Sequence, residues 1–120
     1  MAESTFVGLD VHARSVVAGV LDGNGEVRTC NAPVGTAELV TWLRAQGASV
    51  AVTYEAGPTG YGLARACAAA GIPCLVAAPS KIATAPGERV KTDRRDALRL
   101  AKLLRLGELT PVRVRRGGGP

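Results

Sequence analysis

Histidine and cysteine are scarce in this sequence, which contains one histidine and three cysteines. The cysteines, Cys30, Cys67 and Cys74, are odd in number and form no Cys-x-x-Cys pair. This pattern argues against a zinc site and against a disulfide framework, because both need clustered or paired ligands. We expect buried free thiols in a reducing cytoplasm instead.

Long hydrophobic runs and aromatic residues are also missing. No apolar run approaches the ~20 residues of a membrane span, and the chain enters a strand-like segment within five residues of its start, so we expect neither a signal peptide nor a membrane segment. Aromatic residues make up 3% of the chain, against 47% hydrophobic residues in total and 15 glycines. We therefore expect one globular domain packed from small side chains.

Positive charge is concentrated in the last third of the chain. Residues 1–80 hold four bases and six acids, a net charge of −2, whereas residues 81–120 hold eleven bases and four acids, a net charge of +7. A basic segment beside a mildly acidic one favours a polyanionic partner such as nucleic acid. The alternative is a solvated basic helix and tail.

Hydrophobic periodicity and turn residues predict five strands and three helices. The turn Asp22–Gly25 joins two antiparallel strands, and Thr36 is a plausible N-cap for the first helix. The strands are expected at 5–11, 15–21, 26–32, 49–55 and 73–78, and the helices at 36–46, 61–70 and 92–106, with a basic loop over 79–91.

The resulting order is β-β-β-α-β-α-β-α, which is the order of an α/β fold with an RNase H-like mixed sheet. In such a sheet the first and fourth strands lie side by side and parallel. Asp10 and Glu55 come at the carboxyl ends of these two strands, where open α/β sheets place their sites. We therefore expect the two carboxylates to lie close together.

The last helix carries two acids on the same side as its leucines. On a helical wheel, Asp93 falls with Leu100 and Leu104, and Asp96 lies inside the same apolar arc, whereas the arginines and lysines fall on the other side. Carboxylates on the core-facing side of a helix are unfavourable unless something balances their charge, and a bound divalent cation is the strongest candidate. The alternative is that Thr92 or Asp93 caps the helix and that Asp96 is an ordinary first-turn acid.

Four carboxylates, Asp10, Glu55, Asp93 and Asp96, are thus predicted to converge. At 4 Å each pair repels by ~4 kcal/mol with an effective dielectric constant of ~20, so such a cluster binds cations or retains protons. With hard oxygen ligands and no histidine or cysteine expected nearby, the site favours Mg²⁺ or Mn²⁺. Two such ions support phosphoryl transfer on nucleic acid. The bases expected to hold the nucleic-acid backbone are Lys81, Arg89, Lys91, Arg94 and Arg95.

Three segments make the chain resemble a known family: Gly8–His12, Tyr54–Gly62 and Val90–Ala97. Together they are similar to the N-terminal domain of the insertion-sequence-110 family of DEDD transposases, from about Phe6 to Val112. The resemblance implies a RuvC-like domain in which Asp10, Glu55, Asp93 and Asp96 form a catalytic, metal-binding tetrad. It also implies transposition of an insertion element, with DNA of the element ends and target and a guide RNA as partners, and homo-oligomers in the full-length protein.

The family pattern continues into a second domain with a nucleophilic serine, which this sequence does not match. We expect a RuvC-like domain over residues 1–112, a disordered tail over 113–120, and a truncated chain. Two alternatives remain: a free-standing RuvC-like nuclease, and a non-catalytic nucleic-acid-binding remnant. A metabolite-binding α/β domain is disfavoured by the basic segment and by the absence of a phosphate-loop motif.

Overall fold

The computed structural model describes residues 4–57, 60–79 and 89–112. These ranges contain a five-stranded sheet and three helices in the predicted order β-β-β-α-β-α-β-α. Lys81 and the tail 113–120 lie outside the described residues. The strands are β1 (Thr5–Val11), β2 (Val16–Leu21), β3 (Val27–Ala32), β4 (Val50–Glu55) and β5 (Cys74–Ala77), and the helices are α1 (Thr36–Arg44), α2 (Gly62–Ala69) and α3 (Arg89–Leu106).

The sheet has the strand order β3-β2-β1-β4-β5. β1 pairs antiparallel with β2 and parallel with β4, and β5 extends the parallel half. β1 is therefore the central strand, where the antiparallel meander meets the crossover-connected strands. This is the RNase H-like arrangement that the element order predicted.

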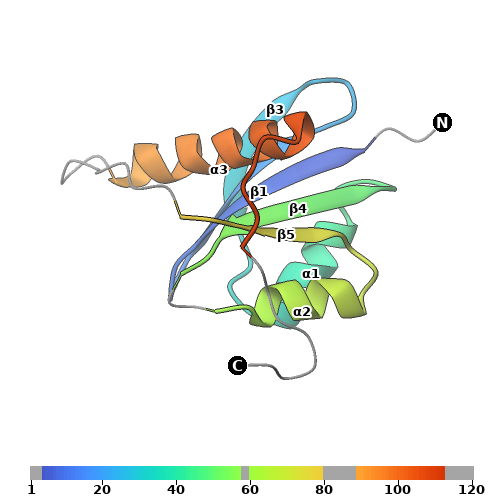
Figure 1. Ribbon diagram of the computed structural model, residues 1–120, viewed down its shortest axis with the longest axis vertical. Coiled ribbons are helices and arrows are strands. Elements are labelled where there is room, and N and C mark those ends of the chain that lie inside the picture. The colour runs from blue at the N-terminus through green and yellow to red at the C-terminus, as the bar shows by residue number, and fades with distance from the viewer. Residues whose placement is uncertain (1–3, 58–59, 80–88, 113–120) are drawn as a thin grey trace.

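Helices cover both faces of this sheet. α1 and α2 lie on one face and α3 lies on the other (Figure 1). The α1/α2 side encloses the main core, in which Val7, Leu9 and Tyr54 of the central strands are at most 1% exposed. Because strand side chains alternate between faces, Gly8, Asp10 and the other residues between these core positions face α3.

Two glycines let α3 approach the sheet closely. A Cβ at Gly8 of β1 would lie 2.7 Å from the amide nitrogen of Ala101, and a Cβ at Gly19 of β2 would lie 2.5 Å from the amide nitrogen of Leu98. Facing these glycines, Ala97 and Ala101 are fully buried. Small residues on both elements thus bring the backbone of α3 against β1 and β2.

The two edges of the sheet differ. Chain that follows α3 lies alongside β5, where Ala77 and Pro111 form an antiparallel bridge and the amide of Val112 donates to the carbonyl of Val76 at 2.7 Å. This segment covers the edge of β5. At the other edge β3 is largely exposed, with Val27 at 48%.

Two predicted helix starts are wrong. The N-cap of α1 is Gly35 rather than Thr36, and no side chain caps it. α3 begins at Arg89, within the segment expected to be a loop, so Thr92 and Asp93 lie inside the helix and do not cap it. The side chains of Arg89 and Lys91 are outside the described part of the chain. In those described ranges, no helix is long and apolar enough to cross a membrane.

Candidate metal centre

Asp10 and Asp93 meet at the carboxyl end of β1. Asp10 is the next-to-last residue of β1, and Asp93 reaches it from the first part of α3, which lies over that strand. One oxygen of each carboxyl lies within 4.8 Å of the other, and each side chain is 19% exposed. The close packing at Gly8 and Gly19 is what holds α3 near enough for this contact.

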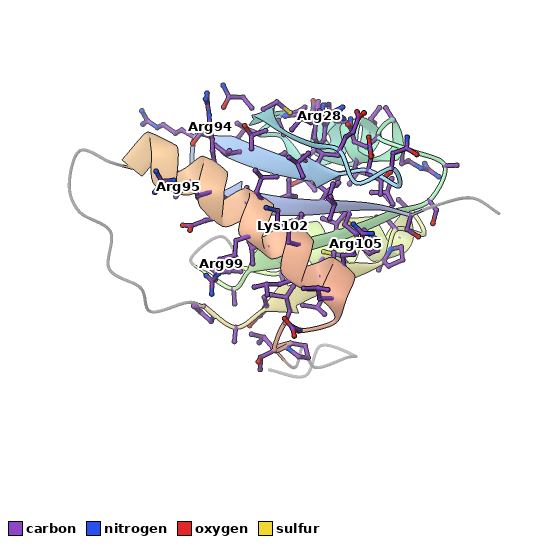
Figure 2. The ribbon with its side chains drawn as sticks, turned by 90° about the horizontal axis from the view of Figure 1, so that it is seen from above. Arg28, Arg94, Arg95, Arg99, Lys102 and Arg105 are labelled. Carbon is purple, nitrogen blue, oxygen red and sulfur yellow. The ribbon has the colours of Figure 1, made fainter. Side chains whose placement is uncertain are left out.

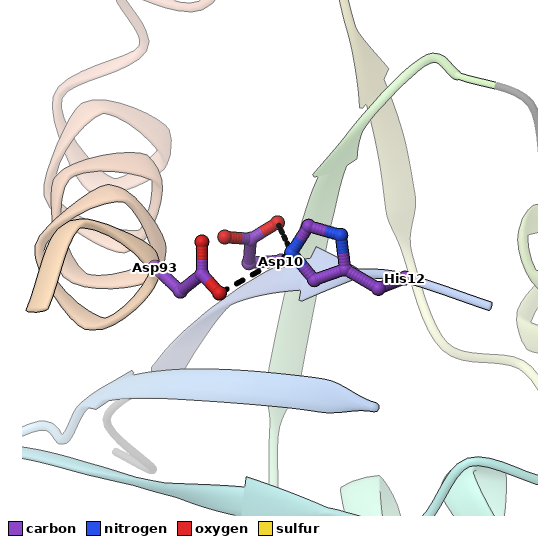
Figure 3. Close-up of polar contacts among 3 residues, drawn as sticks. All are labelled: Asp10, His12 and Asp93. Carbon is purple, nitrogen blue, oxygen red and sulfur yellow. Dashed lines mark ion pairs between the residues drawn. The ribbon is translucent and has the colours of Figure 1, made fainter. Parts of the chain in front are cut away.

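His12 completes the cluster through a single atom. Its Nε2 lies 3.1 Å from Oδ1 of Asp10 and 3.4 Å from Oδ2 of Asp93 (Figure 3). The main chain of His12 is fixed by a 2.9 Å hydrogen bond that its amide donates to the carbonyl of Ser15. The imidazole thus lies at the end of β1 with Nε2 directed toward both carboxylates.

The surroundings raise the pKa of Asp10 from 3.8 to about 6. Burial is the main cause, because it disfavours the charged form. The hydrogen bond to Asp93 and the charges of Asp93 and Asp96 raise the pKa further, and His12 opposes them. Burial and two neighbouring acids thus make the charged form of Asp10 costly in the absence of a cation, and a cation bound between the carboxylates would relieve that cost.

The other two predicted acids are placed less directly. Asp96 lies three residues after Asp93 on α3, is partly exposed, and acts on Asp10 through its charge. Glu55 ends β4, one position beyond the paired residues Leu9 and Tyr54, so it neighbours Asp10 across the parallel pair. Glu55 and Asp96 are not part of the compact group of three that Asp10, His12 and Asp93 form.

The donor atoms of that group fit a metal ion. One oxygen from each aspartate and one nitrogen of His12 lie within 4.8 Å of one another. Ligand bonds of ~2.0–2.2 Å place the donors of one ion up to ~4.4 Å apart, so a movement of less than ~1 Å brings all three into range. Carboxylate oxygens suit Mg²⁺ and Mn²⁺, and an imidazole nitrogen suits transition metals.

The expectation that no histidine lies near the acids is wrong, because His12 contacts both Asp10 and Asp93. A signal for it was present in the sequence. His12 follows Asp10 by two residues, and residues i and i+2 of a strand share a face. Extending the strand periodicity by one residue past Val11 would have placed the imidazole beside the carboxylate.

The outer surface of α3 is basic. Arg95, Arg99 and Lys102 are exposed and recur every three to four residues, which aligns them in a row ~10 Å long. Arg94 and Arg105 are exposed beside this row, on the side toward β2 (Figure 2). Of the predicted nucleic-acid contacts, the exposed pair Arg94 and Arg95 lies next to the acids in sequence. The row continues away from them along the helix.

The chain is similar in sequence to known transposases. The family model of IS110-type DEDD transposases, described as "Transposase", matches residues 7–117. A Sinorhizobium fredii protein named "Putative transposase y4qE" is 47% identical over 115 residues, which are 91% of this chain and 30% of that protein. The transposase for insertion sequence element IS1533 of Leptospira borgpetersenii is 33% identical over 110 residues, covering 88% of this chain and 32% of that protein.

The chain thus spans about a third of the length of these relatives. Among solved structures, the catalytic core domain of BIV integrase is similar, with a TM-score of 0.39 and 16% identity over 78% of this chain and 65% of that one. The family match covers the central strand, the acid at its end and the helix that brings the second acid to it. The chain belongs to the IS110 family of DEDD transposases.

Proposed function

We propose that this chain is the RuvC-like, metal-binding domain of a transposase that acts on DNA in the movement of an insertion element, by Mg²⁺-dependent phosphoryl transfer. The observation that carries the proposal is the convergence of Asp10 and Asp93, from two elements far apart in the sequence, on the same nitrogen of His12. Crowded, partly buried carboxylates are poised to hold a divalent cation. Family membership supports transposition as the process.

Asp10 and Asp93 would hold the cation, with Asp96 and Glu55 as the other acids of the tetrad. A bound Mg²⁺ or Mn²⁺ would neutralise charge on a phosphodiester and activate the attacking water or hydroxyl. Asp10 lies at the carboxyl end of β1, and Asp93 and Asp96 lie three residues apart on α3, which packs over that strand. Burial raises the pKa of Asp10 to about 6, so protons compete with the cation near that pH and the competition weakens as the pH rises above it.

The exposed bases of α3 would hold the phosphate backbone of the DNA beside the acids. Arg94 and Arg95 are adjacent to Asp93 and Asp96 in sequence, and the rest of the basic row leads away from them. Phosphate contacts of this kind position a nucleic acid without reading its sequence. A guide RNA, assembly into homo-oligomers and a cytoplasmic location are further parts of the proposal, and rest on the family resemblance.

Calorimetric titration with Mg²⁺ and Mn²⁺ tests the metal site. We expect the unaltered chain to bind and both Asp10→Asn and Asp93→Asn to lose binding, because each removes one charged oxygen ligand. Asp22→Asn is the matched control: it removes the charge of a partly exposed acid in the turn between β2 and β3 but retains an oxygen for the turn hydrogen bonds. Binding retained in both site variants would contradict the assignment.

DNA binding measured with Mg²⁺ and with EDTA separates the remaining alternatives. The basic row does not depend on a metal, so we expect retention on DNA under both conditions with a steep salt dependence. Mg²⁺-dependent cleavage of branched DNA by this chain alone would favour a free-standing nuclease. DNA binding without metal binding would favour a non-catalytic remnant.

A further inference from the structure

The position of His12 has a chemical consequence for which ion the centre prefers. Both of its contacts, to Asp10 and to Asp93, run through Nε2. A surface histidine that merely bridged two acids could use its two ring nitrogens separately. Here one nitrogen is directed at the space between the two carboxylates, where a shared ion would lie.

The chain supports this orientation from the backbone. His12 directly follows β1, and its amide hydrogen bond to Ser15 closes the short turn into β2. Asp10 and His12 therefore face the same side of the sheet at a fixed separation of two residues. The imidazole is 43% exposed, so it can turn by a small amount without disturbing the core.

We propose that Nε2 of His12 is a nitrogen ligand of the cation held by Asp10 and Asp93, and that it gives the centre a preference for Mn²⁺ over Mg²⁺. The inference rests on the proposed function insofar as Asp10 and Asp93 must bind a divalent cation. Mg²⁺ takes oxygen ligands and retains its waters, whereas transition metals accept imidazole nitrogen. An all-oxygen site gives no such gain to Mn²⁺.

Pulsed electron paramagnetic resonance of the Mn²⁺-loaded chain tests the bond directly. His12 is the sole histidine of the sequence, so a chain without a histidine tag, grown with ¹⁵N-imidazole histidine, reports on this residue alone. At pH 7.5 we expect a ¹⁵N coupling to Mn²⁺ that is absent from His12→Gln. A spectrum with bound Mn²⁺ and no ¹⁵N coupling would refute the proposal, while no Mn²⁺ binding at all would refute the proposed metal centre with it.

Calorimetry measures the preference itself. Loss of an outer-shell partner of a metal ligand costs ~10–100-fold in affinity, and loss of a direct ligand should cost at least as much. We therefore expect His12→Ala to weaken Mn²⁺ binding by at least tenfold and Mg²⁺ binding by much less. His12→Gln guards against misfolding, because it retains a side chain of similar length, and Arg14→Ala is the control in the same exposed turn. An unchanged ratio of Mn²⁺ to Mg²⁺ affinity in both His12 variants would overturn the inference.

Discussion

Replacing Gly8 by alanine tests whether close packing of α3 builds the metal centre. The new Cβ would lie 2.7 Å from the amide nitrogen of Ala101 and 2.8 Å from Cβ of Leu100, where ordinary contacts begin near 3.4 Å. The carbonyl oxygen of Ala97 would lie closer still, so α3 must move outward by more than the 0.7 Å that separates 2.7 Å from 3.4 Å. The obstacle is helix backbone rather than the end of a flexible side chain, so the substitution cannot be absorbed by a rotamer change.

The displacement has two measurable effects. Overpacking a well-packed core costs ~1–3 kcal/mol, and we expect Gly8→Ala to fall in the upper part of that range in urea unfolding. A metal constellation must be held within ~0.5 Å of its productive geometry. Because Asp93 moves with α3 while Asp10 stays on β1, Mn²⁺ affinity should also fall under conditions where the variant is fully folded.

Gly62→Ala is the matched control for this experiment. Gly62 is the first residue of α2, and a Cβ there meets nothing within 4 Å. We expect stability equal to or slightly above that of the unaltered chain, since alanine favours a helix more than glycine does. A Gly8→Ala chain as stable as this control, with unchanged Mn²⁺ affinity, would show that α3 has room to spare and that the packing argument is wrong.

Three further perturbations test other parts of the same geometry. The pKa of Asp10 in the folded state is raised from 3.8 to about 6, so the folded chain binds this proton more tightly than the unfolded chain does. The metal-free chain should therefore lose up to ~2 kcal/mol of stability as the pH rises from about 4 to 6, a figure already reduced for the partial exposure of the side chain. Urea unfolding measured across this pH range should show that loss, and Asp10→Asn should abolish it. Charge reversal of Arg95, Arg99 and Lys102 should weaken DNA binding and lower the slope of its salt dependence by ~1 for each phosphate that these side chains no longer bind. Arg44→Glu on α1, on the other face of the sheet, should leave DNA affinity and its salt dependence unchanged. If Arg44→Glu weakened DNA binding as much as the changes on α3, then α3 would not be the DNA-binding surface. Tyr54→Phe removes a hydroxyl that donates to the carbonyl of Gly60 at 3.1 Å and accepts from the amide of Ala64 at 3.3 Å. Thermal unfolding should show a loss of ~1–2 kcal/mol of stability, while Mn²⁺ binding should be retained. Loss of Mn²⁺ binding in this variant would mean that the tyrosine supports the metal centre.

Much of the fold could be predicted because its signals are local. Apolar runs bounded by glycine, proline and acidic residues mark each strand to within one or two residues. Asp22 makes the predicted hairpin turn, because its carboxylate accepts hydrogen bonds from the amides of Asn24 and Glu26. The start of α3 was missed because the helix already includes Arg89, in a basic, proline- and glycine-containing stretch whose composition favours a loop.

The candidate site was predicted only in part. The period of α3 placed Asp93 and Asp96 toward the sheet, and Asp93 does reach Asp10. Their convergence with Glu55 into one ligand set remains a prediction. His12 was missed because the apolar pattern of β1 ends at Val11, one residue before it.

The sequence by itself determined the order of the elements, the burial of their apolar faces and the position of Asp10 at a strand end, because these depend on periodicity and turn chemistry over a few residues. Tertiary structure alone decided that Gly8 and Gly19 lie beneath α3, that the imidazole of His12 joins two carboxylates, and that burial raises the pKa of Asp10. Each of these depends on distances of a few ångström between segments that lie far apart in the sequence. Such distances are set by how the helix packs on the sheet, which no local pattern in the chain records.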